Sequence, residues 1–210
     1  MAPKEMADSN LNRKYDSTAP AWADKMRMLG YYDAYLGFLA NQTFRAPLGT
    51  RVVDIGCGTG AFADAWLAIH GPEQTVTLLD PSREMLSRAE VALKRRTAKV
   101  KLVQKPLEAF EPDAPFDCAL AAHVIEHHSD PISSLARMRQ MVRRDGRLWL
   151  IVSKPHWCNA IIWFQWRHKA YRQTEVGRLL AETGWALEAE YAFPAGPPSR
   201  TSQGYLARAA

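Results

Sequence analysis

Five short apolar runs alternate with amphipathic segments between residues 51 and 152, and this alternation constrains the fold more than any other feature of the sequence. Short runs rich in valine, leucine and isoleucine are typical of buried strands, whereas apolar residues spaced by three or four positions indicate helices. The expected strands are 50–55, 74–80, 99–104, 116–122 and 147–153, and the expected helices are 60–70, 82–96 and 130–144. Because parallel strands need a crossover between them, this order predicts an α/β fold with a doubly wound parallel sheet covered by helices on both faces.

Capping signals mark where several of these helices begin. Ser82 and Asp130 are favourable N-cap residues, and Pro131 suits the first turn of a helix. A later helix is expected from an N-cap at Thr174 to a stop at Gly184.

The last part of the chain departs from the strand–helix alternation. Two extended segments, 185–193 and 204–209, flank the turn-rich stretch PAGPPSRTSQ. This arrangement predicts an antiparallel hairpin, which is not the usual end of a nicotinamide-dependent dehydrogenase.

Composition and charge narrow the class of protein. Of the 210 residues, 47% are hydrophobic and 23% are charged, and no apolar run approaches the length of about 18 residues that spans a membrane. Three widely spaced cysteines argue against a disulfide framework or a zinc site, and no apolar leader is visible, so we expect a cytoplasmic protein. The net charge is +5, and we interpret the basic stretches 94–101 and 137–147 as solvated helix faces rather than a nucleic-acid surface.

The stretch VVDIGCGTGAF follows the first expected strand and places three glycines in five positions. Such glycines let the backbone turn sharply and approach a ligand closely. Gly56, Gly58 and Ala61 fit the dinucleotide pattern G-x-G-x-x-G/A, while Gly56, Gly58 and Gly60 fit a tighter G-x-G-x-G turn. Asp80 ends the next strand 24 positions after Gly56, where a carboxylate binds the hydroxyls of a ribose. Both patterns therefore predict an adenosine cofactor.

Three features favour a cofactor that carries a cationic amino group over a dinucleotide. About 150 residues follow the glycine loop, which leaves little room for a second half-sheet or substrate domain. Asp54 lies at the mouth of the loop, where it would repel a pyrophosphate and attract an ammonium group. The segment HVIEHHSDP after the fourth strand has no counterpart in the dinucleotide pattern.

In these motifs the chain resembles the class I S-adenosylmethionine-dependent methyltransferases of the small-molecule type. The resemblance covers roughly residues 15–209 and rests on VVDIGCGTG, LLDPSREML, FDCALAAHVIEHHSDP and LARMRQMVRRDGRLWLIVSKP, in that order. It implies a Rossmann-like, seven-stranded sheet, mostly parallel with an antiparallel C-terminal hairpin strand, and a cofactor across the carboxyl ends of the strands. It also implies one methyltransferase domain over 1–210, with an N-terminal helical cover (11–45), a cofactor-binding core (50–153), an aromatic substrate segment (154–172) and the hairpin (185–209).

The resemblance also assigns candidate site residues. The expected cofactor-binding residues are Tyr15, Asp54, Gly56, Cys57, Gly58, Gly60, Asp80, Pro81, Ser82, Met85, Leu107, Ala122 and His123. The glycine loop and Asp54 would hold the methionine portion, Asp80 the ribose, and Tyr15 would close over the cofactor. After the third strand the sequence VQKPLEAF lacks the acid that often binds the adenine amino group in this family, so Leu107 is left to pack on the ring. The expected substrate-binding residues are His156, Trp157, Trp163 and Trp166.

The predicted function is direct SN2 transfer of a methyl group from S-adenosylmethionine to O, N or C of a small hydrophobic or aromatic metabolite, such as a quinone precursor, lipid or natural product. His123 and His127 are the candidate catalytic residues, since an O or N acceptor must lose a proton. No nucleic acid partner is expected, and a peripheral membrane contact stays open. The alternatives are an RNA or DNA methyltransferase, a cofactor-binding protein without catalysis, and a zinc hydrolase built on the H-x-x-E-H motif at 123–127. We expect no metal, because that motif follows the fourth strand without a helix to carry it.

Overall fold

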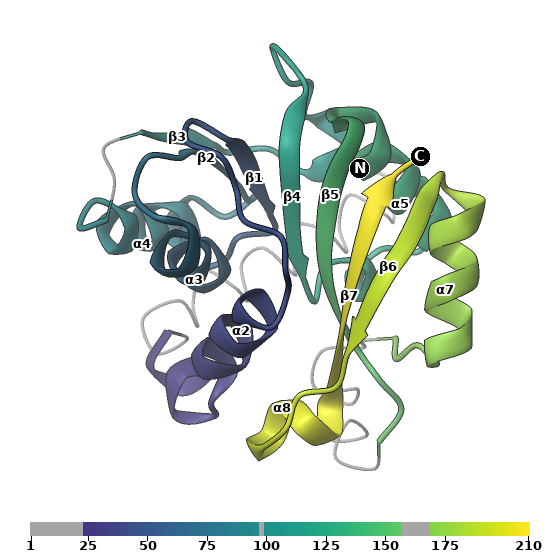
Figure 1. Cartoon of the computed structure of the whole chain (residues 1–210). Coiled ribbons are helices and arrows are strands. Elements are labelled where there is room, and N and C mark those ends of the chain that lie inside the picture. The colour runs from purple at the N-terminus through teal and green to yellow at the C-terminus, as the bar shows by residue number, and fades with distance from the viewer. Residues whose placement is uncertain (1–22, 97–98, 157–168) are drawn as a thin grey trace, which may run out of the picture.

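The structure is a computed structural model that describes residues 23–96, 99–156 and 169–210. In these ranges seven strands form one sheet in the order β3-β2-β1-β4-β5-β7-β6 (Figure 1). The strands are β1 (Arg51–Ile55), β2 (Thr75–Leu79), β3 (Val100–Val103), β4 (Phe116–Ala122), β5 (Val142–Ser153), β6 (Trp185–Tyr191) and β7 (Ser202–Ala209). The helices are α2 (Tyr31–Ala40), α3 (Ala61–His70), α4 (Arg83–Leu93), α5 (Pro131–Met141), α7 (Gln173–Glu182) and α8 (Gly196–Thr201), with 3-10 turns η1 (Leu107–Ala109) and η2 (Ile125–His127).

The strand pairing confirms the predicted sheet. β3, β2, β1, β4 and β5 are parallel, and β7 lies antiparallel between β5 and β6. After β1 the chain builds outward to β2 and β3 and then returns to place β4 on the other side of β1. Such a reversal opens a crevice at the carboxyl ends of the two central strands, where ligands bind in α/β sheets of this kind.

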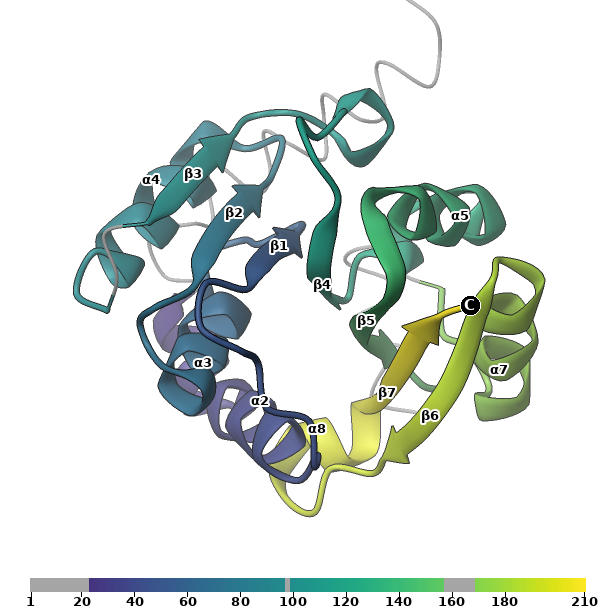
Figure 2. The same ribbon diagram turned by 45° about the horizontal axis from the view of Figure 1, so that its top comes forward.

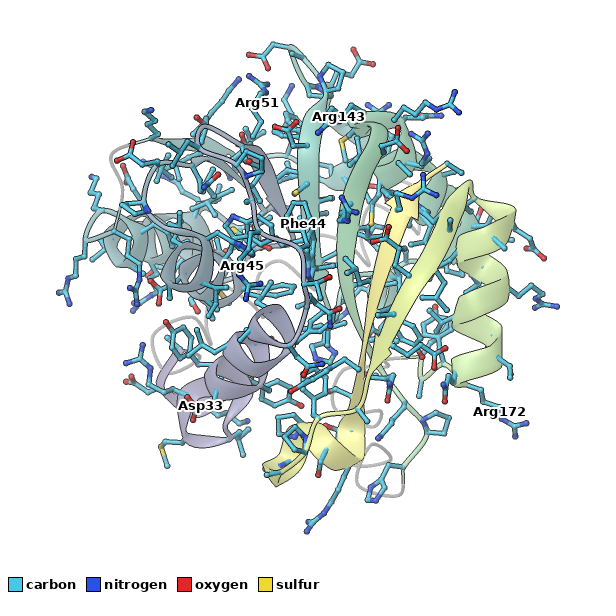
Figure 3. The ribbon with its side chains drawn as sticks, in the orientation of Figure 1. Asp33, Phe44, Arg45, Arg51, Arg143 and Arg172 are labelled. Atoms are coloured by element: carbon cyan, nitrogen blue, oxygen red, sulfur yellow. The ribbon has the colours of Figure 1, made fainter. Side chains whose placement is uncertain are left out.

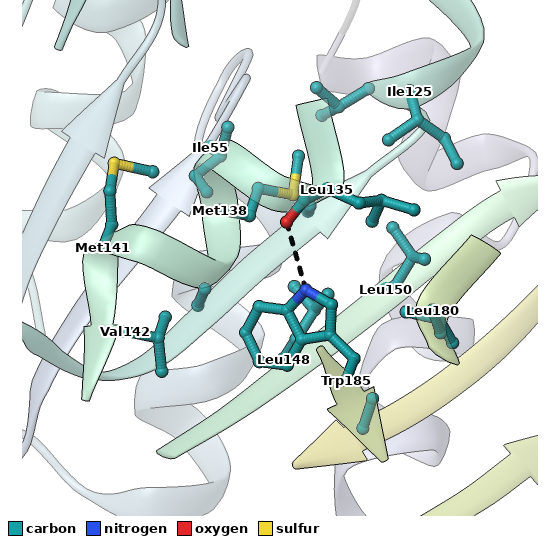
Figure 4. Packing of buried hydrophobic residues seen from close by; sticks show 14 of the residues in the cluster. Ile55, Ile125, Leu135, Met138, Met141, Val142, Leu148, Leu150, Leu180 and Trp185 are labelled. Atoms are coloured by element: carbon teal, nitrogen blue, oxygen red, sulfur yellow. Dashed lines mark hydrogen bonds between the residues drawn. The ribbon is translucent and has the colours of Figure 1, made fainter. Parts of the chain in front are cut away.

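Helices cover both faces of the sheet, as Figure 2 shows with α2, α3 and α8 on one side and α5 and α7 on the other. Alternate residues of a strand supply the two cores: Val52 packs with α2, α3 and α4, and Val53 packs with α5 and α7. On the second face the indole N–H of Trp185 donates to the carbonyl oxygen of Leu135 in α5 at 3.1 Å (Figure 4). Burial on both faces explains why the central strands read as continuous apolar runs.

The end of α5 differs from the sequence prediction. The helix expected over 130–144 ends at Met141, and β5 begins at Val142 instead of residue 147. Val142 is buried and pairs with Phe116 in β4, while the guanidinium of Arg139 donates to the Val142 carbonyl oxygen at 3.0 Å. These contacts fix Val142 in the sheet, so the helical pattern of the basic residues beyond it is overridden.

Two boundaries near the C-terminus also differ. The helix expected to start after an N-cap at Thr174 begins at Gln173, with Arg172 as a cap residue whose side chain makes no capping bond. The stretch expected to be a turn contains the short helix α8, with a proline in its first turn. N-caps at Ser82 and Asp130 are confirmed, because their side chains accept backbone N–H groups of the following helices.

At the N-terminal side the described chain enters the fold through α2. Gly30 has φ 79° and precedes α2, so the helical region expected over 11–45 is interrupted there, and α2 ends at Ala40. Among the residues that the structure describes, no helix combines the length and apolar character needed to cross a membrane.

The basic residues at the amino-terminal end of the sheet form ion pairs. Arg143 contacts Asp117 at 2.6 Å and Arg51 contacts Asp113 at 2.9 Å. Figure 3 shows Arg51 and Arg143 near the top of the sheet, above Phe44. Exposed pairs of this kind contribute about 0–1 kcal/mol. Arg143 lies in β5, so this part of the stretch 137–147 is not the helix face that the sequence predicted.

His70, at the end of α3, predicts a loss of stability in acid. Its ring lies 4.0 Å from that of Trp66 between centroids, and its Nδ1 accepts the backbone N–H of Ala46 at 3.3 Å. Burial, and then the charge of Arg45, lowers the pKa of His70 to about 4. In the unfolded chain the pKa is about 6.5, so the unfolded state takes up the proton first and stability falls as pH drops from about 6.5 to about 4.

We expect His70→Asn, which keeps an acceptor near Nδ1 and cannot titrate, to flatten this pH dependence. Allowing for solvent at the ring edge, the difference between wild type and variant should change by about 1–2 kcal/mol between pH 7 and pH 4. Urea unfolding at a series of pH values measures it. Parallel curves for the two proteins would show that His70 does not control acid stability.

Candidate functional site

The glycine loop joins β1 to α3 at the crevice between β1 and β4. Gly56, Gly58 and Gly60 all have positive φ values, of 61°, 51° and 82°, which only glycine adopts without strain. A Cβ at Gly56 would meet the side chain of Val124 at 2.8 Å, and one at Gly60 would meet Ala89 at 2.9 Å. A Cβ at Gly58 would have no atom of the described residues within 4 Å. The outer two glycines are therefore needed for packing within the protein, whereas Gly58 borders open space.

Asp80 connects the glycine loop to the end of β2. One carboxylate oxygen, Oδ2, accepts the N–H of Gly58 at 2.9 Å, and the other, Oδ1, accepts the N–H of Ser82 at 2.8 Å. Ser82 then caps α4 by accepting the N–H of Met85 at 3.1 Å. These two backbone bonds fix the Asp80 carboxylate between the glycine loop and the start of α4. Asp80, which is predicted to bind the ribose, thus also fixes the loop that is predicted to bind the methionine portion.

Asp54 lies under the loop and is only 1% exposed. Its Oδ2 accepts the N–H of Ala63 in the first turn of α3 at 3.1 Å. Burial, together with the nearby charge of Asp80, raises the pKa of Asp54 to about 8, against the opposing effect of the Ala63 bond. The carboxyl group therefore holds its proton near neutral pH until a cation approaches it.

The residues predicted to contact adenine differ in accessibility. Met85 is 1% exposed and Leu107 is 4% exposed, so both side chains belong mainly to the core. Pro81 is half-buried at the surface, and its carbonyl oxygen accepts the amide N–H of Gln104 at 3.4 Å. Sequence reasoning missed Gln104, which follows β3 where the family often has an acid; its position was the available signal.

His123 lies directly after β4 and has φ 58°, an uncommon conformation for a residue other than glycine. Its Nδ1 is 3.1 Å from Oε1 of Glu126 and 3.2 Å from Oγ of Ser153 at the end of β5. Its Nε2 is 3.4 Å from Oγ of Ser202 at the start of β7. The ring packs edge-on against Tyr31 of α2 at 5.7 Å. Sequence reasoning identified His123 but not Ser153, Ser202 or Tyr31, because no local pattern links these distant positions.

The H-x-x-E-H segment does not form the α-helix that a zinc hydrolase of this kind needs. Residues Ile125–His127 form a 3-10 turn, and Glu126 is directed at His123 and at the N–H of Ser153, which it accepts at 2.6 Å. Within 23–96, 99–156 and 169–210 no group of three or more histidine, cysteine or acidic side chains is arranged to hold a metal ion. His128, which follows the motif, contacts Glu108 at 2.7 Å.

The remaining predicted site residues fall into two groups, those outside the described residues and those within them. Tyr15, Trp157, Trp163 and Trp166 lie outside the described residues. His156 is described after the end of β5, half-buried, and Ala122 and Cys57 flank the crevice on β4 and on the loop.

Comparison with known proteins gives a match over the same region. Residues 53–148 match a family model described as a methyltransferase domain. An uncharacterized 37.1 kDa protein in transposon TN4556 of Streptomyces fradiae is 29% identical over 208 residues, covering 89% of this chain and 56% of that protein. The ubiquinone biosynthesis O-methyltransferase of Paracidovorax citrulli is 35% identical over 112 residues, covering 51% and 45%, and tRNA U34 carboxymethyltransferases also match.

A solved structure with the same fold is the 1,6-didemethyltoxoflavin-N1-methyltransferase of Burkholderia thailandensis, which contains 1,6-didemethyltoxoflavin and S-adenosylhomocysteine. It is 21% identical, with a TM-score of 0.75 and coverage of 100% of this chain and 91% of that one. The chain spans about half the length of the curated relatives that it matches.

Proposed function

We propose that the chain, whose residues 53–148 match a methyltransferase domain, is a class I S-adenosylmethionine-dependent methyltransferase that methylates a small molecule. The observation that carries this proposal is the open space at Gly58, next to an acid below the loop and an acid at the end of β2. These residues suit a ligand with an ammonium group at one end and a ribose at the other.

The residues present fit S-adenosylmethionine in charge. Asp54 would face the ammonium group, the glycine loop would hold the methionine portion, and Asp80 would face the ribose hydroxyls. Pro81 would border the adenine, with Gln104 in place of the missing acid. When bound, the cofactor supplies a methyl group that is already activated on a sulfonium sulfur. The protein then has to align an acceptor, exclude water and receive a proton.

His123 is the residue best suited to receive that proton. It follows β4 at the switch point and its side chain is 20% exposed, so it is sheltered yet reachable. His127, the other candidate, ends the turn η2 on the far side of Glu126. The segment with Trp157, Trp163 and Trp166 is proposed as an apolar wall for the acceptor, with His156 at its edge.

A small hydrophobic or aromatic acceptor is favoured over RNA. The names of the matching relatives include both a quinone methyltransferase and tRNA carboxymethyltransferases, so they support either class. The arginines at the amino-terminal end of the sheet are paired with acids, which leaves that surface poorly suited to phosphate groups.

Calorimetry tests the cofactor assignment. Wild-type protein should bind S-adenosylmethionine and S-adenosylhomocysteine at one site, and Asp80→Ala should weaken both by about 10–100-fold, the value of charge-assisted hydrogen bonds. Asp130→Ala is the matched control, since the Asp130 side chain likewise accepts two backbone N–H groups, but these are the N–H groups of Ile132 and Ser133 in α5, away from the glycine loop. Binding of NAD without binding of S-adenosylmethionine would overturn the proposal.

A further inference from the structure

The two ring nitrogens of His123 have different surroundings. Nδ1 faces the carboxylate of Glu126 at 3.1 Å, and Nε2 faces the hydroxyl of Ser202 at 3.4 Å. A hydroxyl either donates or accepts, whereas an ionised carboxylate only accepts. If Glu126 is ionised, Nδ1 must carry the proton of the neutral ring and Nε2 is left as an acceptor.

Glu126 is held in the ionised form although its side chain is wholly buried. Burial by itself raises the pKa of Glu126, but the hydrogen bond of His123, the charge that His123 carries when protonated and the N–H of Ser153 bring it below its ordinary value. One oxygen, Oε1, receives both of these contacts. Glu126 therefore determines which ring nitrogen of His123 carries the proton.

The second oxygen of Glu126, Oε2, indicates that the contact between Glu126 and His123 has a role beyond holding the fold together. Oε2 is buried and has no hydrogen-bond partner among the described residues. Burying a carboxylate with one oxygen unsatisfied is costly, and a neutral amide would tie η2 to β5 through Ser153 equally well. A negative charge here is useful only if a positive charge forms beside it.

The backbone conformation of His123 is also strained. A residue other than glycine in the left-handed region is strained by about 1–3 kcal/mol, and such strain gathers at functional sites. Here the turn is fixed by the N–H of His123, which donates to the Ile151 carbonyl oxygen at 2.8 Å. It directs the ring toward Tyr31 on α2 and Ser202 on β7.

We propose that Glu126 is a positioning residue that holds His123 as the Nδ1–H tautomer, so that Nε2 takes a proton from a neutral O–H or N–H group of the methyl acceptor. The inference rests on the proposed function and narrows its substrate class to acceptors that must be deprotonated. The acceptor proton passes to Nε2, and the electron pair left on O or N forms the bond to the methyl carbon. The pair of the broken carbon–sulfur bond stays on sulfur, and the imidazolium is neutralised by Glu126. The titratable groups that face the ring are Glu126 and Tyr31.

Nitrogen NMR of the histidine side chains tests the proposal without cofactor or acceptor. In wild-type protein labelled with ¹⁵N-histidine, the neutral ring of His123 should carry its proton on Nδ1, the less common tautomer in water. Glu126→Met keeps most of the volume but removes both carboxylate oxygens, so Nδ1 loses its acceptor and the proton should move to Nε2. Signals are assigned with His123→Asn, over a pH series that reaches the neutral ring.

The chain offers a matched control in His128, which also contacts a glutamate through Nδ1. Glu108→Met should alter the His128 signals and leave those of His123 unchanged. A proton on Nε2 of His123 in the wild type, or an unchanged tautomer in a folded Glu126→Met, would overturn the proposal. The wild-type spectrum decides even if the variant does not fold. Failure of S-adenosylhomocysteine binding in calorimetry would separately remove the proposed function.

Discussion

Replacing Gly58 by valine should abolish binding of S-adenosylmethionine and S-adenosylhomocysteine, with a loss of at least about 100-fold. The added atoms enter open space, because no heavy atom of the described residues lies within 4 Å of a Cβ built at this glycine. They would fill the space that the cofactor needs beside the loop. The loop N–H groups would also shift, because φ 51° is strained by about 1–3 kcal/mol for a residue that is not glycine. Calorimetry at ligand concentrations up to the millimolar range measures the loss.

Gly49 provides the control for backbone strain in this experiment. It also has a positive φ, of 76°, and open space around a Cβ, but it precedes β1 at the opposite end of the sheet. Gly49→Val should lower the melting temperature by a similar amount and leave cofactor binding intact. If both variants lost binding equally, strain rather than occupied space would be the cause, and Gly58 would not border the cofactor.

The sequence was sufficient to predict the sheet because its strongest signals are local. Buried parallel strands are apolar on both faces, so β1, β2 and β4 stand out from their neighbours within a few residues. The predicted end of α5 was wrong because Val142 pairs in the sheet with Phe116, which is distant in the sequence. The helix α8 was also missed, since its proline and glycine residues are typical of turns and only its place between β6 and β7 decides otherwise.

Only those features of the candidate site that lie in local motifs could be predicted from the sequence. Gly56, Gly60 and Asp80 lie in motifs whose spacing reflects one strand and one turn. By contrast, the contacts of His123 come from Ser153 and Ser202, which reach it only when β5 and β7 lie side by side. A sequence shows which residues are chemically suitable, but the partner of each nitrogen depends on the register of the sheet.

Asp54→Asn should make the protein more stable at pH 8 and a weaker binder of the cofactor. The pKa of Asp54 is about 8 in the folded protein and about 4 in the unfolded chain, so the folded state keeps a proton that the unfolded state loses. Stability is therefore full below about pH 4 and is lost as pH rises toward 8. Asparagine retains an acceptor for the Ala63 N–H and has no charge to bury. Its advantage over wild type should grow with pH to the order of 2–5 kcal/mol, measured by urea unfolding at a series of pH values.

The same variant should bind the cofactor more weakly, because binding requires the ionised carboxylate of Asp54 whereas folding favours the neutral form. An ammonium group beside Asp54 favours the ionised carboxylate, so binding at pH 6.5 should release a proton from the wild type. Calorimetry in buffers of different ionisation enthalpy measures this release, which Asp54→Asn should remove while weakening S-adenosylhomocysteine by about 10–100-fold. Asp117→Asn, at the other end of β4, should leave affinity unchanged because Asp117 contacts Arg143 and the N–H of Arg51 away from the loop. Equal proton release by wild type and Asp54→Asn would place the titrating group elsewhere. Both effects together would mean that Asp54 is kept at a cost to stability because the cofactor requires its charge.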